Sequence, residues 1–308
     1  MSNNLKVINI ELTQNCPLNC KQCYKSSTNK YMEFSEVVKI GESIRYTDWN
    51  QVNLSGGEVM LHKNIIEIID YFCCIGKKIK IVTSGYGLND TIIEALSRNR
   101  NHVTLVISLN SVDKKTNSEL RDGYNFAISA INKCVINKIP FNINCVVYNN
   151  NISNLEQLIL FAKEKGVNKV SLLKYKMVND AINTKRLSKI DYIKLLKLIE
   201  KYKDVIAIQS CWIELMNMLS VNNDMGIRNG CIAAKSYFNI TTNGEITGCP
   251  QLREIIPKEE FKKVINLNTP GLDHKESEKC NDINCVYFKK CNPCQAIKTC
   301  DISAKRGC

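Results

Sequence analysis

Short apolar runs typical of β-strands alternate with helical patterns from the start of the chain to about residue 210. In one such helical pattern, Leu155, Leu158, Ile159 and Ala162 share one face, and Gly166 ends the run. The predicted strands are Val7–Leu12, Gln51–Leu54, Lys78–Thr83, Val103–Leu109, Phe141–Val147 and Val170–Leu173. The predicted helices are Ser35–Tyr46, Ile65–Cys74, Thr91–Ser97, Asn125–Asn137, Asn154–Lys165 and Ile190–Lys203.

Strands that alternate with helices predict βαβ units and a parallel sheet, which makes this an α/β chain. The six units are too few for a closed eight-stranded barrel, so we expect an open, partial (β/α)6 barrel of the TIM type. In either parallel architecture the ligand site forms at the carboxyl ends of the strands. We therefore expect the chemically active residues in the loops that follow strands.

The pattern changes in the last quarter of the chain. From Cys231 onward it is rich in Cys, Asn and Gly, with little long helical periodicity. Asn243-Gly244, between Tyr237–Thr241 and Glu245–Thr247, predicts a two-residue hairpin turn. The rest of the segment, to Cys308, buries too little apolar surface to fold without cross-links, and metal ligation by cysteines can supply these. We predict a barrel domain over residues 1–210 and a small Cys-rich domain over residues 211–308.

Composition excludes several classes of protein. Of the 308 residues, 44% are hydrophobic and 23% charged, as in ordinary soluble proteins, and no apolar run is long enough to span a bilayer. The polar amino terminus shows no signal peptide, so we expect a cytoplasmic protein without a membrane partner. The formal charge of +12 is spread along helix faces and no basic block interleaves with aromatics, so we expect no nucleic-acid partner.

Sixteen cysteines are many for such a chain, and they are clustered. Three lie between residues 16 and 23, and eight lie between residues 231 and 308. Clustered cysteines in a cytoplasmic enzyme favour metal sites over disulfides. The other five, which we interpret as small apolar residues of the core, are Cys73, Cys74, Cys134, Cys145 and Cys211.

The first cluster follows the first predicted strand directly, as Cys16-Pro-Leu-Asn-Cys20-Lys-Gln-Cys23. Three thiolates with this spacing on one loop can bind three irons of a [4Fe–4S] cube. The fourth iron then has no protein ligand and is open to a small molecule. The alternative is a structural zinc site, but zinc needs four ligands and no suitable fourth ligand follows nearby.

The stretch from Ile10 to Tyr24 resembles the signature of radical S-adenosylmethionine (radical SAM) enzymes, in which CxxxCxxC follows the first strand. In that family the open iron binds the amino and carboxylate groups of SAM. Reduction of the cluster cleaves the sulfonium to methionine and a 5′-deoxyadenosyl radical, which abstracts a hydrogen atom from the substrate. The resemblance covers residues 7 to about 175 and implies Tyr24 as a further cofactor contact.

Other positions of the family follow in order along the chain. Ser55-Gly56-Gly57-Glu58, after the second predicted strand, is similar to the GGE motif that contacts the SAM amino group. Paired glycines let the backbone approach a ligand closely, and a carboxylate suits an ammonium. The resemblance implies further cofactor contacts at the ends of the third and fourth strands and beyond, with Arg121 pairing with the SAM carboxylate. These contacts are Ser84, Ser108, Asn110 and Arg121.

The carboxyl-terminal cysteines resemble the SPASM extension of some radical SAM enzymes, which binds two auxiliary [4Fe–4S] clusters. Cys231, Gly244 and Cys249 match its opening CxₙGx₄C, and a CxxCx₅CxxxC-like block with a last cysteine follows. The spacing inside that block departs from the family pattern, so the pairing of ligands stays open, and structural zinc is the rival interpretation. The eight candidate ligands are Cys231, Cys249, Cys280, Cys285, Cys291, Cys294, Cys300 and Cys308.

The resemblance implies SAM-dependent radical modification of a ribosomally made peptide or of a protein side chain, as a thioether or carbon–carbon crosslink or a related oxidation. A flavodoxin- or ferredoxin-type reductant is the implied partner. Because the first predicted strand begins at Val7, we expect leader recognition to come from a separate protein or a groove on the barrel. The alternatives are radical tailoring of a small molecule or cofactor precursor, and a non-catalytic iron–sulfur electron carrier or sensor. The residue types alone identify no catalytic acid, base or hydrogen donor.

Overall fold

The strands form one curved sheet in the order β7-β6-β5-β4-β3-β2-β1-β8-β9. The computed structural model describes residues 5–176, 185–212, 215, 219, 231–252 and 254–267. Neighbouring strands are parallel from β7 through to β8, and β9 is antiparallel to β8. The strands are β1 (Val7–Thr13), β2 (Gln51–Gly56), β3 (Lys78–Thr83), β4 (Val103–Ser108), β5 (Phe141–Val147), β6 (Lys169–Lys174), β7 (Ile206–Ile208), β8 (Tyr237–Ile240) and β9 (Ile246–Thr247).

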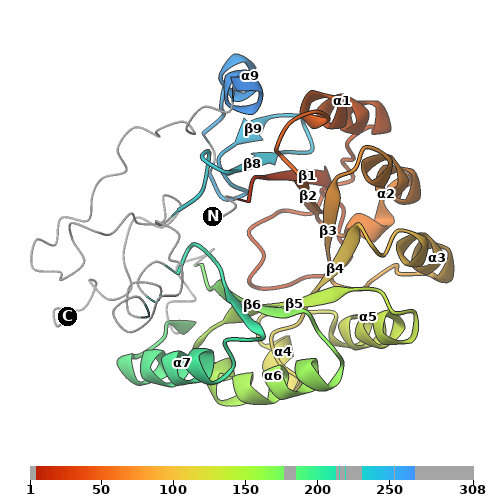
Figure 1. Ribbon diagram of the computed structural model, residues 1–308. Coiled ribbons are helices and arrows are strands. Elements are labelled where there is room, and N and C mark those ends of the chain that lie inside the picture. The colour runs from red at the N-terminus through yellow and green to blue at the C-terminus, as the bar shows by residue number, and fades with distance from the viewer. Residues whose placement is uncertain are drawn as a thin grey trace, which may run out of the picture.

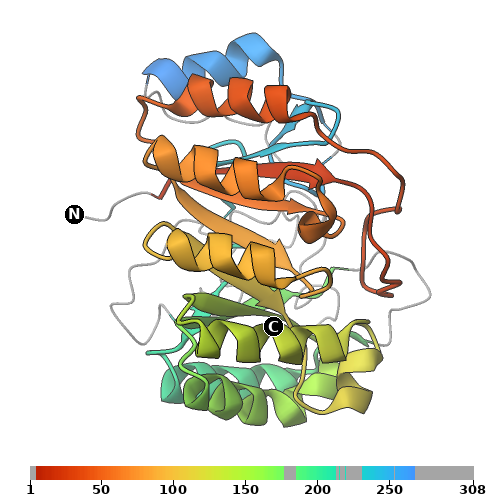
Figure 2. The same ribbon diagram turned by 90° about the vertical axis from the view of Figure 1, so that its right-hand side faces the viewer.

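Helices cover the outer face of this sheet and connect its parallel strands (Figure 1). Seen from the side, they lie next to one another from α9 and α1 at one end of the sheet to α7 at the other (Figure 2). The helices are α1 (Phe34–Ile44), α2 (Ile65–Cys74), α3 (Asp90–Arg98), α4 (Lys114–Ser118), α5 (Tyr124–Ile136), α6 (Leu155–Glu164), α7 (Lys189–Lys201) and α9 (Lys258–Leu267), with 3-10 turns η1 (Val59–Leu61) and η2 (Asn149–Asn154). No helix of the described residues is long and apolar enough to cross a membrane.

Strands β1 and β2 alternate between an apolar outer face and a polar inner face, whereas the inner positions of β3, β5 and β6 include Val82, Val146 and Leu173. In β1, Ile8, Ile10 and Leu12 are fully buried in the core beneath the helices, where each contributes about 1.5–3 kcal/mol. Asn9 of the same strand points the other way and lines a cavity inside the barrel. Parallel strands covered on both faces are usually apolar throughout, so this alternation marks the inner face as the wall of a polar site.

The predicted α/β class and partial barrel are confirmed. All six predicted strands and all six predicted helices are present, each end within two residues of its predicted position. The predicted hairpin is present as β8 and β9, but the predicted two-residue turn at Asn243-Gly244 is wrong. The Gly244 N–H donates to the Thr241 carbonyl at 2.8 Å, so Thr242 and Asn243 are the central residues, and Gly244 follows with φ +77°. The sequence pattern missed β7, α4 and α9, because β7 and α4 have only three and five residues and α9 lies in a segment with little other helical periodicity.

Strand β8 also pairs with β1, which the sequence pattern did not predict. Four Cα pairs, from Val7↔Tyr237 to Ile10↔Ile240, join these strands in parallel although they lie far apart in the chain. The domain boundary after residue 210 stays a prediction, but the first part of the second segment continues the barrel sheet. The candidate ligands Cys280, Cys285, Cys291, Cys294, Cys300 and Cys308 lie outside the described residues.

A buried histidine fastens the segment after the cysteine loop to the turn after β2. The Nδ1 atom of His62 accepts a hydrogen bond from the Asn64 N–H at 3.1 Å, so the proton is on Nε2, which donates to the Met32 carbonyl at 2.8 Å. The ring is 2% exposed and packs edge-on against Tyr31. Burial is the main cause that lowers the pKa of His62 below its ordinary value.

We expect the free energy of unfolding to fall as the pH drops below about 6.5 towards the lowered pKa of His62. Unfolded chains bind the proton first, because the pKa of this group is lower in the folded state, so the contribution is complete only above the unfolded pKa. Urea unfolding of wild type and His62→Gln at several pH values measures it. The free energy of unfolding of the variant should fall less steeply towards acid pH than that of wild type. Parallel dependences on pH would contradict the role given to His62.

Candidate active site

A cavity of about 990 Å³ lies at the carboxyl ends of the parallel strands and extends into the barrel. Its walls combine the loop after β1, the ends of β2, β3, β4 and β6, and the segment around β8 and β9. Of the predicted site residues, it brings together Cys16, Cys20, Cys23, Tyr24, Ser55, Gly56, Gly57, Glu58, Ser84, Ser108, Arg121, Cys231 and Cys249. Asn110 lies behind the wall, fully buried.

The cysteine loop is held in place by the chain around it. The Cys16 N–H donates to Ser27 Oγ at 3.1 Å, and the Gln22 N–H donates to the Leu120 carbonyl at 3.2 Å. Cys20 Sγ accepts a hydrogen bond from the Asp122 N–H at 3.3 Å. The three thiols are free, from half-buried to exposed, and burial raises the pKa of Cys16, so metal binding there releases a proton.

Two glycines let the turn after β2 lie directly against this loop. The Gly57 N–H donates to the Thr13 carbonyl at 2.7 Å, and the Glu58 N–H donates to the Asn15 carbonyl at 2.8 Å. A Cβ on Gly56 would lie 2.3 Å from the Thr13 oxygen, and one on Gly57 would lie 2.2 Å from the Asn15 oxygen. The sequence suggested that these glycines make room for a ligand. In the structure, the backbone of Thr13 and Asn15 occupies the space where their Cβ atoms would lie.

The Glu58 carboxylate joins the ends of β2 and β3. It accepts hydrogen bonds from Thr83 Oγ1 at 2.6 Å and from the Ser84 hydroxyl and N–H at 2.5 and 2.8 Å. The Met60 N–H is a fourth donor, at 3.3 Å. Burial raises the pKa of Glu58 in spite of these donors. Glu58 is 1% exposed and its carboxylate already accepts four hydrogen bonds, so in this arrangement it holds the ends of β2 and β3 together at the wall of the cavity.

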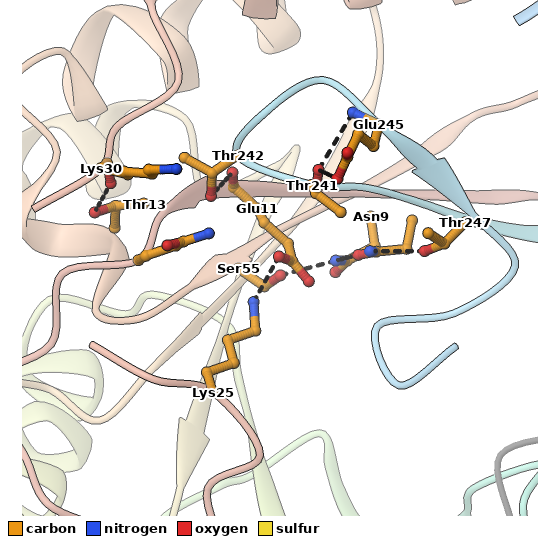
Figure 3. Close-up of polar contacts among 12 residues, drawn as sticks. Asn9, Glu11, Thr13, Lys25, Lys30, Ser55, Thr241, Thr242, Glu245 and Thr247 are labelled. Carbon is orange, nitrogen blue, oxygen red and sulfur yellow. Dashed lines mark hydrogen bonds and ion pairs between the residues drawn. The ribbon is translucent and has the colours of Figure 1, made fainter. Parts of the chain in front are cut away.

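A chain of buried polar side chains crosses the inner face from β2 to β9 (Figure 3). The Asn9 amide donates to Ser55 Oγ at 2.8 Å and to Asn239 Oδ1 at 2.7 Å. Asn239 donates in turn to Thr247 Oγ1 at 3.1 Å, and that hydroxyl donates to the carbonyl of Cys249 at 3.0 Å. Hydrogen bonds thus connect the turn of the GGE-like motif with a candidate auxiliary ligand. Sequence patterns did not reveal Asn9 or Asn239.

A buried ion pair lies beside this chain. Lys25 Nζ is 2.8 Å from Glu11 Oε2, with the two side chains 15% and 8% exposed (Figure 3). The pair anchors the residue that follows Tyr24 to strand β1. Tyr24 itself is 44% exposed and lines the cavity.

Cys231 and Cys249 face the same cavity from the opposite part of the chain. Cys231 is buried and Cys249 half-buried, and burial raises the pKa of Cys249. Of the five cysteines that the sequence pattern assigned to the core, Cys134 and Cys145 are buried, whereas Cys74 is exposed on α2 and Cys211 lines the cavity. Thiols from two distant segments therefore line one cavity, and thiols are the donors that iron–sulfur clusters need. Within the part of the chain that the structure describes, no three metal-ligating side chains lie close enough together to hold a metal ion.

Comparison with known proteins gives a family match and several partial relatives. A family model for the radical SAM superfamily matches residues 10–162. The antilisterial bacteriocin subtilosin biosynthesis protein AlbA of Bacillus subtilis is 31% identical over 117 residues, covering 37% of this chain and 25% of that protein. PqqA peptide cyclase of Methylocella silvestris is 26% identical over 274 residues, which cover 82% of this chain and 70% of that protein.

Relatives of another kind also match. A probable GTP 3′,8-cyclase of Sulfurisphaera tokodaii is 28% identical over 204 residues, covering 63% of this chain and 62% of that protein. The chain thus spans from 25% to 70% of the length of these curated relatives. Among solved structures, Streptococcus suis SuiB bound to precursor peptide SuiA has a TM-score of 0.67 at 19% identity, covering 80% of this chain and 59% of that chain. Such a likeness shows a shared fold.

We expect Gly56→Ala to lower the free energy of unfolding by about 2–6 kcal/mol, because strain at a positive φ and a backbone clash add up. Gly56 has φ +147°, and its Cβ would meet the Thr13 oxygen. Gly166→Ala is the control, since Gly166 has φ +72° with open space around the added Cβ. Urea unfolding compares the two variants. Equal losses of unfolding free energy in the two variants would mean that the clash with the cysteine loop does not add to the cost of the substitution.

Proposed function

Because the chain belongs to the radical SAM superfamily, we propose that it cleaves S-adenosylmethionine reductively and modifies a side chain of a ribosomally made peptide or of a protein. The superfamily implies a [4Fe–4S] cluster and SAM as cofactors. The observation that carries the proposal is that three thiols of one loop, the Gly56-Gly57 turn and Arg121 all face one cavity.

In this proposal Cys16, Cys20 and Cys23 hold the cluster. A cluster bound there would supply the electron that splits the sulfonium of SAM into methionine and a 5′-deoxyadenosyl radical. The described residues contribute binding and orientation. Arg121 lies beside the cysteine loop, where a cation suits a ligand carboxylate. The Asp122 N–H on Cys20 Sγ supplies a backbone hydrogen bond to a ligand sulfur, which is one of the levers on cluster potential.

The proposed substrate class draws on the names of relatives. AlbA takes part in bacteriocin biosynthesis, PqqA peptide cyclase acts on a peptide, and SuiB binds its precursor peptide. The contacts proposed for SAM lie at Tyr24, Ser55, Gly56, Gly57, Glu58, Ser84, Ser108 and Arg121, all of which line the cavity. Asn110, which is buried behind the wall, is proposed to act through Gln22. A flavodoxin- or ferredoxin-type reductant and a separate leader-binding protein are proposed partners.

We also propose auxiliary clusters. Cys231 and Cys249 share the cavity with the cysteine loop, as a cluster near a radical site requires. Such a cluster would accept an electron from the product or hold a substrate thiolate. Its remaining ligands are proposed among the cysteines from Cys280 to Cys308.

A small molecule is the second candidate substrate class, since the probable GTP 3′,8-cyclase relative matches 63% of this chain. Mass spectrometry separates the two classes. Candidate peptides and, separately, GTP are incubated with reduced enzyme and SAM, and the mass of each is compared before and after.

Replacing Cys16, Cys20 and Cys23 with alanine should abolish release of 5′-deoxyadenosine from SAM under reducing conditions, because the cluster loses all three ligands. Liquid chromatography with mass detection measures the product. Cys74→Ala, at an exposed position on α2, is the control and should retain release. Persistent release by the triple variant would overturn the proposal, and absence of release from wild type would favour the electron carrier or sensor.

Iron and sulfide analysis of anaerobically purified protein tests the auxiliary clusters. We expect about twelve iron atoms per chain in wild type and about eight in the triple variant, since each [4Fe–4S] cluster holds four. Cys249→Ala should lower the count while retaining the SAM cluster. About four iron atoms in wild type would contradict the two auxiliary clusters and would still agree with the cluster proposed at Cys16, Cys20 and Cys23.

A further inference from the structure

Gln22 lies between Cys20 and Cys23 and connects the cysteine loop with two other residues. In one orientation of its amide, Oε1 accepts a hydrogen bond from Asn110 Nδ2 at 2.8 Å. In the other orientation, Oε1 accepts from Arg121 Nη2 at 2.8 Å and from Nε at 3.2 Å. One amide oxygen therefore faces two donor groups, and it can satisfy only one of them at a time.

Asn110 cannot turn to relieve this competition. Its Oδ1 accepts a hydrogen bond from the Val146 N–H at 3.0 Å, which fixes Nδ2 towards Gln22. Its backbone N–H donates to Asn117 Oδ1 at 2.9 Å, and the residue is fully buried. The donor on this side is a fixed part of the barrel wall.

Arg121 is anchored through its backbone. Its N–H donates to the Asn117 carbonyl at 3.0 Å, and its own carbonyl accepts from Asn117 Nδ2 at 3.1 Å. The next residue, Asp122, donates its N–H to Cys20 Sγ. Asn117 therefore sets the positions of both Asn110 and Arg121, and the Gln22 amide is the group between them that can rotate.

A surplus of donors at one point favours an anionic ligand. A carboxylate offers two oxygens to a guanidinium, and such charge-assisted bonds are about twice as strong as neutral ones. With a carboxylate on Arg121, the Gln22 oxygen is released to accept from Asn110. The Gln22 Nε2 group then lies 2.8 Å from Arg121 Nη2, where it needs the same carboxylate as its acceptor. Gln22 and Arg121 both line the cavity, so a ligand there reaches them.

We propose that Gln22 is a positioning residue that holds the Arg121 guanidinium ready for the carboxylate of SAM and turns its amide to Asn110 when that carboxylate binds. This inference rests on the proposed function. It makes a residue inside the cysteine motif part of the selection of SAM over analogues that lack the amino-acid group.

The test compares two ligands on anaerobically reconstituted protein. SAM carries the carboxylate, and 5′-methylthioadenosine lacks it. For Gln22→Glu, whose side chain would pair with Arg121 and compete with the carboxylate, we expect about a tenfold or greater weakening of SAM binding. Gln22→Met, of similar length, should weaken SAM binding by a smaller factor. Neither change should alter the dissociation constant for 5′-methylthioadenosine by more than about twofold.

Lys21→Met is the matched control, because Lys21 is the exposed neighbour in the same loop. Its dissociation constants should equal those of wild type. Iron content and the electron paramagnetic resonance spectrum without SAM confirm that each variant carries the cluster. If Gln22→Glu does not bind the cluster, the SAM affinity of Gln22→Met alone tests the role of Gln22. Equal weakening of both ligands, or of neither, would overturn the role of Gln22. Failure of wild type to bind SAM would instead reject the proposed function.

Discussion

The close contact between two backbone segments determines the geometry of the site. The turn at Gly56-Gly57 lies against the loop after β1 with no room for a Cβ, and two backbone hydrogen bonds hold it there. This contact sets the distance between the cysteine loop and the strand ends that line the cavity. Since backbone atoms carry it, the arrangement tolerates little displacement, which is what orientation of a reactive cofactor requires.

The inner face of the barrel is stabilised by hydrogen bonds rather than by apolar packing. Around β1, β2 and β8, apolar side chains point outward to the helices, and the inward positions carry Asn and Ser side chains that bond to one another. Farther along the sheet the inward positions are mixed, since Val82, Val146 and Leu173 also line the cavity. Glu58 accepts four hydrogen bonds and Asn9 donates two. Buried polar networks of this kind fix one arrangement, because an unpaired member would carry the full cost of desolvation.

The pairing of β8 with β1 brings the two ends of the chain to the same site. Strand β1 leads into the cysteine loop on one side of the cavity, and β8 leads into the hairpin before Cys249 on the other. The Thr242 hydroxyl also donates to the carbonyl of Glu11 at 3.0 Å, which fastens the hairpin to the end of β1 (Figure 3). Cysteines that are more than 200 residues apart in the chain, such as Cys23 and Cys231, therefore line one cavity.

The sequence by itself determined the six βα units, the place of the cysteine loop after the first strand and the hairpin around Asn243-Gly244. These features are local: apolar periodicity, turn residues and ligand spacing act within one or two turns of chain. Only the tertiary structure decided that β8 joins β1, that Asn9 bonds to Asn239, and that Gln22 lies between Asn110 and Arg121. It also decided that Gly56 and Gly57 admit another backbone segment. Each of these features joins segments that lie far apart in the sequence. Local residue type and spacing do not determine which distant segments pack together.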